Sequence, residues 1–142
     1  NCSQVDRREI ASELASGELD FALDIPELEK ADLNGVDLLQ DRYVCVLRQG
    51  HPFAKRTLTL EDYLALEHVM VSSRRRGRGH VDIALARIGR QANTVMRVPH
   101  SQPALHAVMS SDMAVTMSLS LAALFPSFGI AVEPSAGVAF GL

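Results

Sequence analysis

The stretch Leu14-Ala15-Ser16-Gly17-Glu18-Leu19-Asp20-Phe21-Ala22-Leu23 passes from helical spacing to strand alternation across a single glycine. Upstream, Asp6 and Glu9 have the Asp-x-x-Glu spacing of a capped helix start, which predicts a helix over residues 7–16. Gly17 can adopt the left-handed conformation that ends a helix. Apolar and polar residues then alternate over 19–23, as in a half-buried strand. A helix followed by a buried strand is typical of an α/β domain, which binds ligands at the carboxyl ends of its strands.

A helix followed by a strand recurs three times in the second half of the chain. Thr59, with Asp62 three residues later, caps the first helix, Gly89 ends the second, and Ser101 caps the third. The strands that follow these helices are expected over residues 69–72, 94–98 and 114–117. Three such units in succession predict parallel strands with right-handed crossovers.

The segments before and after this repeating pattern are less regular. A long strand is expected over residues 36–47, where apolar residues are frequent. After residue 118 a short helix is expected to end near Phe125, and prolines and glycines then divide the chain into brief extended pieces.

Composition limits the classes of protein to which the chain can belong. Its 142 residues, 47% hydrophobic and 22% charged, suffice for a buried core and do not indicate disorder. No apolar run approaches the length of a membrane helix. The net charge of −3 argues against this segment holding DNA by itself. Two cysteines without ligand spacing are expected to be free thiols.

Several stretches resemble the effector-binding, or substrate-binding, domain of LysR-type transcriptional regulators, in particular the aromatic-responsive and nodulation-type branch. They are LASGELDFAL, LLQDRYVCVLRQGHPFA, LTLEDYLALEHVMVSSRRRGRGHVD and VPHSQPALHAVMSSDMAVTM. The resemblance covers nearly the whole chain. It implies a fold like the type 2 periplasmic binding proteins, with two α/β subdomains of parallel-strand sheets flanked by helices. It also implies a small effector in the cleft between them, and a separate N-terminal winged helix-turn-helix that binds DNA.

The resemblance also implies a division of the chain. Subdomain I is expected to comprise residues 1–47 and 119–142, and subdomain II residues 48–118, with a hinge near Arg48. A complete domain of this family has a further strand and helix at each end. The chain is therefore expected to be truncated at both ends, with its first lobe incomplete.

Four strand ends supply short polar groups beside apolar ones, which is the composition of a small-molecule cleft. His100 follows one strand, and Ser101 precedes a helix whose first N–H groups suit an anion. This pair is either a ligand contact or an N-cap beside a surface histidine, and the resemblance favours ligand contact. The expected effector-binding residues are Asp24, Pro26, Ser72, Ser73, Arg74, His100, Ser101, His106, Thr116 and Met117. Ordinary core packing is the alternative explanation for Met117, and a capping or turn function is the alternative for Asp24 and Pro26. For His106, a core or surface role is favoured over ligand contact.

The arginine-rich loop after the strand at 69–72 is not a P-loop, because it lacks the Lys-Ser/Thr ending of that motif. Its glycines and backbone N–H groups could surround an anion. Solvent exposure is expected for Arg75, Arg76 and Arg78, whereas Arg74 is close enough to the strand end to reach an effector.

No enzyme motif is present, and the five histidines lack metal-ligand spacing. We therefore expect no catalysis, no metal and no cofactor. The expected function is inducer sensing in a cytoplasmic regulator that forms homodimers or tetramers, in part through the helix at 80–88, and that contacts DNA only through another domain. The alternative hypothesis is a periplasmic-type solute-binding receptor for uptake. A third hypothesis is a small α/β enzyme that uses His100 or Ser101.

Overall fold

The computed structural model describes residues 5–6, 8–24, 33–72, 79–126 and 130–132. The chain forms two compact units, Asn1–Leu39 and Gln40–Leu142. Every strand described lies in the second unit. The predicted partition into subdomains 1–47 with 119–142 and 48–118 stays a prediction, and residues on both sides of Arg48 contribute to one sheet.

The first unit contains the helix α1, Ile10–Ser16. Gly17 ends it with φ 80° in the left-handed region, as the sequence predicts. The predicted helix start is wrong, because Glu9 is the N-cap and makes no side-chain capping bond. The Asp6 carboxylate instead accepts from the backbone N–H and the guanidinium of Arg8, at 3.0 and 2.7 Å. The Asp6 carboxylate, to which the Asp-x-x-Glu spacing assigned a capping role, is therefore paired with Arg8, two residues further along the chain.

The strand expected over residues 19–23 is wrong. Residues 17–24 form no strand, and Phe21 and Leu23 are 84% and 79% exposed. Alternation produces a strand only where a second strand accepts its backbone hydrogen bonds. No strand is described elsewhere in this unit, so the apolar side chains at 19–23 have no sheet to join.

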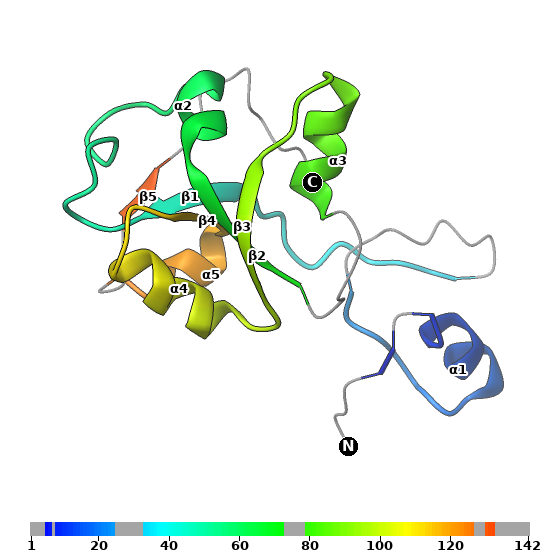
Figure 1. The fold of residues 1–142 in the computed structure, drawn as a ribbon. Helices are drawn as coiled ribbons and strands as arrows, with labels where there is room; N and C mark the ends of the chain where they lie inside the picture. Colours follow the sequence, from blue (N-terminus) through cyan, green and yellow to red (C-terminus); the bar gives the residue numbers. More distant parts are fainter. Residues whose placement is uncertain (1–4, 7, 25–32, 73–78, 127–129, 133–142) are drawn as a thin grey trace. The chain divides into compact units, whose positions relative to one another are not determined.

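The second unit is built on a mixed five-stranded sheet of order β3-β2-β4-β1-β5 (Figure 1). Its strands are β1 Tyr43–Leu47, β2 Glu67–Val71, β3 Asn93–Val98, β4 Ala114–Ser118 and β5 Ile130–Val132. β2 runs parallel to both β3 and β4, while β1 runs antiparallel to β4 and β5. The three predicted helix-strand units thus form the parallel part of the sheet, which confirms the α/β class.

The long strand expected over residues 36–47 is wrong in its first half. Only β1 is a strand, and Val36 and Leu38 are 83% and 69% exposed. β1 pairs with β4 from Tyr43 opposite Ser118 to Val46 opposite Val115. The strand therefore begins where its partner ends, although the apolar pattern extends further towards the N-terminus.

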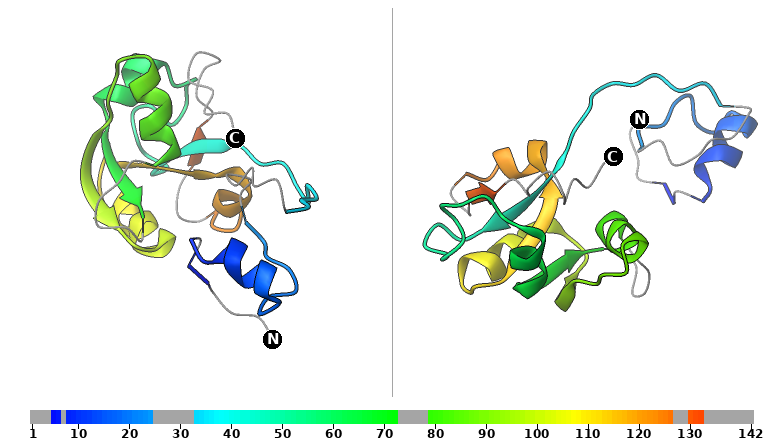
Figure 2. Two further views of the ribbon diagram at one scale, coloured as in Figure 1. Left: turned by 90° about the vertical axis from the view of Figure 1, so that its right-hand side faces the viewer. Right: turned by 90° about the horizontal axis from the view of Figure 1, so that it is seen from above.

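Helices cover both faces of the sheet (Figures 1 and 2). They are α2 Leu60–Ala65, α3 His80–Arg87, α4 Ser101–Met109 and α5 Leu119–Ala123. Thr59 and Asp62 form the predicted capping box at α2, with both bonds at 3.1 Å. Gly89, with φ 70°, follows the end of α3 as predicted. The predicted cap of α4 is displaced by one residue, because His100 is the N-cap and Ser101 is the first helical residue.

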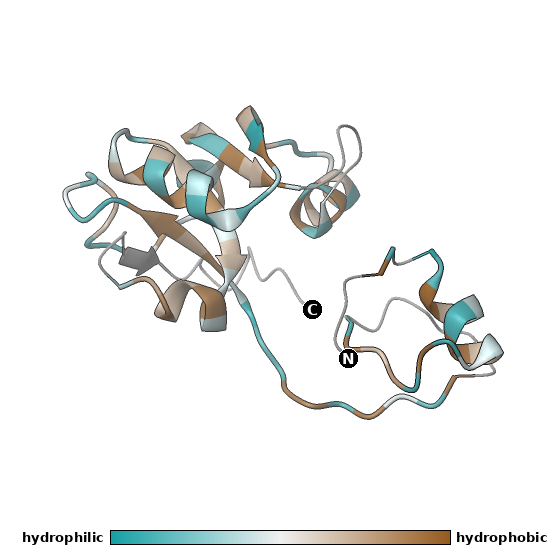
Figure 3. Ribbon diagram, turned by 90° about the horizontal axis from the view of Figure 1, so that it is seen from below, coloured by the Kyte–Doolittle hydropathy of each residue, from teal (hydrophilic) through white to brown (hydrophobic). Residues whose placement is uncertain are grey.

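The core consists of two apolar clusters on opposite faces of the sheet, and Figure 3 shows hydrophobic residues along the strands and on the helices that cover them. We call these faces the α2/α3 face and the α4/α5 face. Successive residues of β1 alternate between them, since Cys45 and Leu47 belong to the first cluster and Val44 and Val46 to the second. This alternation gives the second unit a three-layered packing.

His68 of β2 is a buried polar residue on the α2/α3 face, 4% exposed. Its ring nitrogen Nε2 lies 2.7 Å from the backbone carbonyl of Tyr63, and its ring lies 4.3 Å from the Tyr63 ring. Burial lowers the pKa of His68, and the bond to Tyr63 opposes this only in part. The imidazole is therefore neutral at neutral pH, and it holds the end of α2 on the sheet.

We expect Leu105→Ala to destabilise the second unit by about 2–5 kcal/mol, because Leu105 of α4 is 1% exposed within the α4/α5 cluster. Urea unfolding measures the loss. Leu124→Ala is the matched control, since Leu124 is 72% exposed and its truncation should change stability by under roughly 0.5 kcal/mol. Equal losses in the two variants would contradict the assignment of the core.

Because the pKa of His68 is lowered in the fold, the unfolded state binds more protons once the pH falls below about 6.5. Stability should therefore decrease as the pH falls from 6.5 towards the lowered pKa. His68→Gln removes this titration, so urea unfolding between pH 7 and 5 should show a shallower dependence than in the wild type. The control is Gln102→Ala, which changes an exposed residue of α4 without a titratable group and should retain the wild-type dependence. The same slope in His68→Gln as in the wild type would refute the assignment.

Candidate functional site

The ends of β2, β3 and β4 meet at one edge of the sheet, which we call the carboxyl edge. Val71 pairs with Val98, and the N–H of Ser72 donates to the Val98 carbonyl at 2.8 Å. β1 runs the other way and begins at this edge, with Tyr43 opposite Ser118. The residues of the carboxyl edge are Tyr43, Ser72, Pro99, His100, Ser101, Thr116 and Ser118. This is the edge where open α/β sheets bind ligands.

The N-terminus of α4 supplies hydrogen-bond donors to this edge. The N–H groups of Ser101 and Gln102 lie in the first turn, where a helix offers no internal acceptor, and Pro103 has no N–H. His100 makes no capping side-chain bond, and its own side chain is exposed. Two amide donors, the partial positive charge of the helix end and an imidazole together suit a carboxylate or phenolate.

Thr116 brings a hydroxyl to the same edge from β4. Its Oγ1 lies 2.8 Å from the phenolic oxygen of Tyr63, which belongs to α2. Thr116 is half-buried, whereas Tyr63 is only 2% exposed. Burial raises the pKa of Tyr63 although its bond to Thr116 lowers it, so the phenol keeps its proton at neutral pH. The pair therefore carries no charge of its own.

Asp41 fastens the segment before β1 to the start of α5. Its carboxylate accepts from the N–H of Arg42 at 2.8 Å and from that of Ser120 at 3.3 Å. Burial raises the pKa of Asp41, but these bonds and those from the Ser118 and Ser120 hydroxyls lower it overall. A negative charge is thus held beside Ser118 by hydrogen bonds. Nothing local in the sequence indicates this contact, because Asp41 and Ser120 are 79 positions apart.

Aromatic side chains also reach this part of the sheet. The Tyr43 ring lies 6.2 Å from the imidazole of His80, the first residue of α3. Sequence reasoning missed Tyr43, Tyr63 and His80 as residues near the site. The inward position of Tyr63 on its helix is the one signal that could have identified it.

Of the predicted site residues, Ser72, His100, Ser101 and Thr116 lie in or just after the carboxyl-terminal parts of the parallel strands β2, β3 and β4. Met117 is 4% exposed and packs in the α4/α5 cluster. His106 is exposed in a later turn of α4, and Asp24 is an exposed residue of the first unit. The predicted residues Pro26, Ser73 and Arg74 lie outside the described part of the chain.

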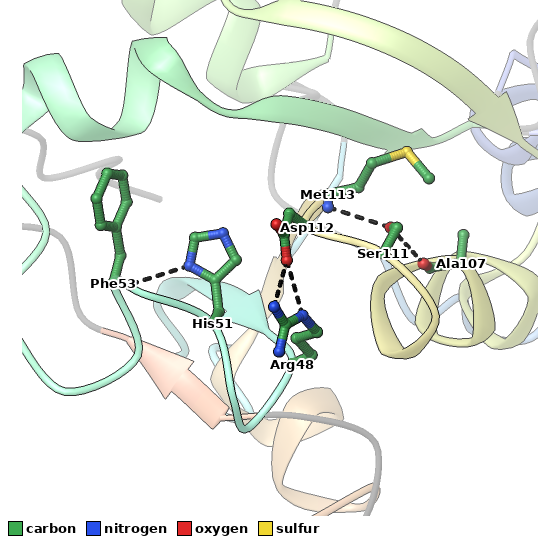
Figure 4. Close-up of polar contacts among 7 residues, drawn as sticks. All are labelled: Arg48, His51, Phe53, Ala107, Ser111, Asp112 and Met113. Carbon is green, nitrogen blue, oxygen red and sulfur yellow. Dashed lines mark hydrogen bonds and ion pairs between the residues drawn. The ribbon is translucent and has the colours of Figure 1, made fainter.

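The opposite edge of the sheet carries a different set of polar contacts (Figure 4). Arg48, directly after β1, bonds to Asp112, directly before the turn into β4, at 2.6 and 2.7 Å. His51 is 7% exposed, and its Nδ1 accepts from the N–H of Phe53 at 3.0 Å. Ser111 links Met113 to Ala107. These bonds tie loops to one another and to the end of α4, which is a structural role.

Among the described residues, no group of three or more histidine, cysteine, aspartate or glutamate side chains is placed to hold a metal ion. Within the same residues, every helix is too short or too polar to span a bilayer.

The comparisons with known proteins agree with this architecture. A family model described as the LysR substrate binding domain matches residues 1–137. The HTH-type transcriptional activator NahR of Pseudomonas putida is 32% identical over 85% of this chain and 41% of its own length. The HTH-type transcriptional activator NagR of a Ralstonia species is 34% identical over 88% of this chain and 42% of its own. The chain thus spans about two-fifths of these curated relatives.

Solved structures show the same fold. A transcriptional regulator of Pseudomonas aeruginosa, PA0477, is 33% identical with a TM-score of 0.70 over 87% of this chain and 43% of that one. HinK, a LysR family transcriptional regulator from the same species, has a TM-score of 0.69 over 94% of this chain and 48% of that one. At 15% identity, HinK supports the fold alone. With the match over residues 1–137, these likenesses show that the chain belongs to the LysR substrate-binding domain family.

Proposed function

We propose that this chain is the effector-sensing domain of a LysR-type transcriptional regulator. The observation that carries the proposal is the carboxyl edge, where the parallel strands β2, β3 and β4 end, α4 begins at His100 without a side-chain cap, and Thr116 lies near the end of β4. Membership of the family and the regulators among its relatives support the same function. Neither NahR nor NagR is a solute-binding receptor by name, so the uptake alternative receives no support.

The effector we propose is a small anionic compound, an aromatic carboxylate or a phenolate. Amide donors and a helix N-terminus favour negative charge, and an imidazole can add a hydrogen bond. Ser72, His100, Ser101 and Thr116 would form one wall of the site. Contacts by Asp24, Pro26, Ser73, Arg74 and His106 remain predictions. Binding without catalysis, metal or cofactor is part of this proposal.

The mechanism we propose is a population shift. An effector changes an equilibrium only through its different affinities for two arrangements of the protein, and a tenfold preference corresponds to about 1.4 kcal/mol. DNA binding would belong to a helix-turn-helix domain of the whole protein, acting in the cytoplasm as a homodimer or tetramer. The sequence encoded upstream of Asn1 tests this part, since a signal peptide in place of a helix-turn-helix would contradict it.

We expect benzoate or one of its ring-hydroxylated derivatives to raise the melting temperature of the protein expressed from its complete reading frame. A ligand that binds only the native state adds about 2.7 kcal/mol of stability at a concentration 100 times its Kd. Calorimetric titration then gives the Kd. The absence of any shift across aromatic carboxylates and phenols would reject this effector class.

We further expect His100→Ala and Ser101→Ala each to weaken binding roughly tenfold, as for loss of a hydrogen bond to a charged group. Ser110→Ala is the matched control, because Ser110 follows the opposite end of α4 and its hydroxyl donates to the His106 carbonyl. Its Kd should equal that of the wild type. Wild-type affinity in both His100→Ala and Ser101→Ala would remove the start of α4 from the site.

A further inference from the structure

We propose that Tyr63 is a positioning residue of the effector site, which orients the Thr116 hydroxyl so that this group donates its hydrogen to a bound acceptor. The inference rests on the proposed function and names a specificity-determining residue within it. Tyr63 lies on α2, a helix that contributes no residue to the carboxyl edge as defined above.

The acidity of the two hydroxyl groups favours Tyr63 as the donor of their shared hydrogen bond. A phenolic hydroxyl is more acidic than an aliphatic one, so it is the better donor when the two share one hydrogen bond. The two oxygens are 2.8 Å apart, a separation at which either hydroxyl can donate, and on this ground of acidity we assign Tyr63 as the donor and Thr116 Oγ1 as the acceptor. The hydrogen of Thr116 is then directed away from Tyr63. A threonine bonded in this way presents a donor rather than an acceptor to a ligand.

The phenol is held firmly enough to impose this orientation. Tyr63 is 2% exposed in the core cluster of the α2/α3 face, and its ring packs on His68 at 4.3 Å. Its backbone carbonyl is bonded to His68 Nε2, and α2 begins with the capping box of Thr59 and Asp62. Burial keeps the phenol protonated, so it remains a donor throughout the working pH range. Thr116 is also β-branched and therefore restricted at χ1.

The orientation has a consequence for the choice of ligand. A fixed donor favours a carboxylate oxygen over the N–H₂ group of the corresponding amide, because two donors cannot bond to one another. Without Tyr63 the Thr116 hydroxyl can rotate and accept as well as donate. Tyr63 should therefore matter more for the discrimination between acid and amide than for the general fit of the ring.

The test uses the protein from its complete reading frame and the benzoate derivative that gives the largest thermal shift, together with its primary amide. Calorimetric titration should show that Tyr63→Phe weakens carboxylate binding about fivefold to tenfold and reduces the ratio of acid to amide affinity. Thr116→Val should weaken carboxylate binding similarly. Thr116→Ser keeps the hydroxyl and should retain affinity within about threefold.

A double-mutant cycle separates positioning from packing. In the Thr116→Val background, Tyr63→Phe should change the carboxylate Kd by less than about twofold. The Thr116 hydroxyl, which the Tyr63 hydroxyl orients, is already absent from that background. A purely structural effect of Tyr63 would instead persist in that background. Urea unfolding of each variant confirms that titrations are made on folded protein.

The outcomes distinguish this inference from the proposed function. Wild-type protein that binds no aromatic acid rejects the effector class, and the inference with it. Binding that is unaffected by Thr116→Val, or that is weakened by Tyr63→Phe equally in both backgrounds, overturns the inference alone. Wild-type affinity and selectivity in Tyr63→Phe would overturn it as well.

Discussion

Burial of β1 on both faces is the constraint on which the second unit depends. Its residues from Val44 to Leu47 are at most 3% exposed, and they contribute alternately to the two core clusters. A strand that is apolar on both sides requires a covering layer on each, and α2 with α3 and α4 with α5 provide these layers. Once both faces are closed, polar groups can meet a ligand only at the ends of the strands. The position that we propose for the site thus follows from the packing of the core.

The two edges of the sheet differ in how their polar groups are used. At the edge near Arg48, charged and hydroxyl groups bond mainly to other parts of the chain. At the carboxyl edge, the start of α4 has no side-chain cap, and Pro103 removes one N–H from the first turn. An uncapped helix start beside water costs stability that a cap would supply, roughly 1 kcal/mol. The lack of a side-chain cap leaves the first amide donors of α4 for the anion that we propose to bind there.

Local signals in the sequence predicted local structure well. Gly17 and Gly89 end helices because their positive φ suits glycine, and the Thr59–Asp62 capping box needs only residues within one turn. Strand bounds were predicted less well, since Phe21 and Val36 lie in alternating or apolar stretches that no described strand pairs. The candidate site shows the same division between features that neighbouring residues predict and contacts between distant segments. His100, Ser101 and Thr116 follow from strand ends, whereas the bonds of Asp41 to Ser120 and of Tyr63 to Thr116 join segments 79 and 53 positions apart.

A sensing site affects regulation only where ligand contacts differ between two arrangements of the protein. The chain enters the sheet through the segment between Leu39 and Tyr43, which is the covalent connection between the two units. Asp41 anchors this segment to the first turn of α5, next to Ser118 at the carboxyl edge. The effector proposed for this edge would therefore bind beside the connection. A hydrogen bond to a charged group contributes about 1.5–3 kcal/mol, so a single contact made in one arrangement alone suffices for a tenfold shift between them.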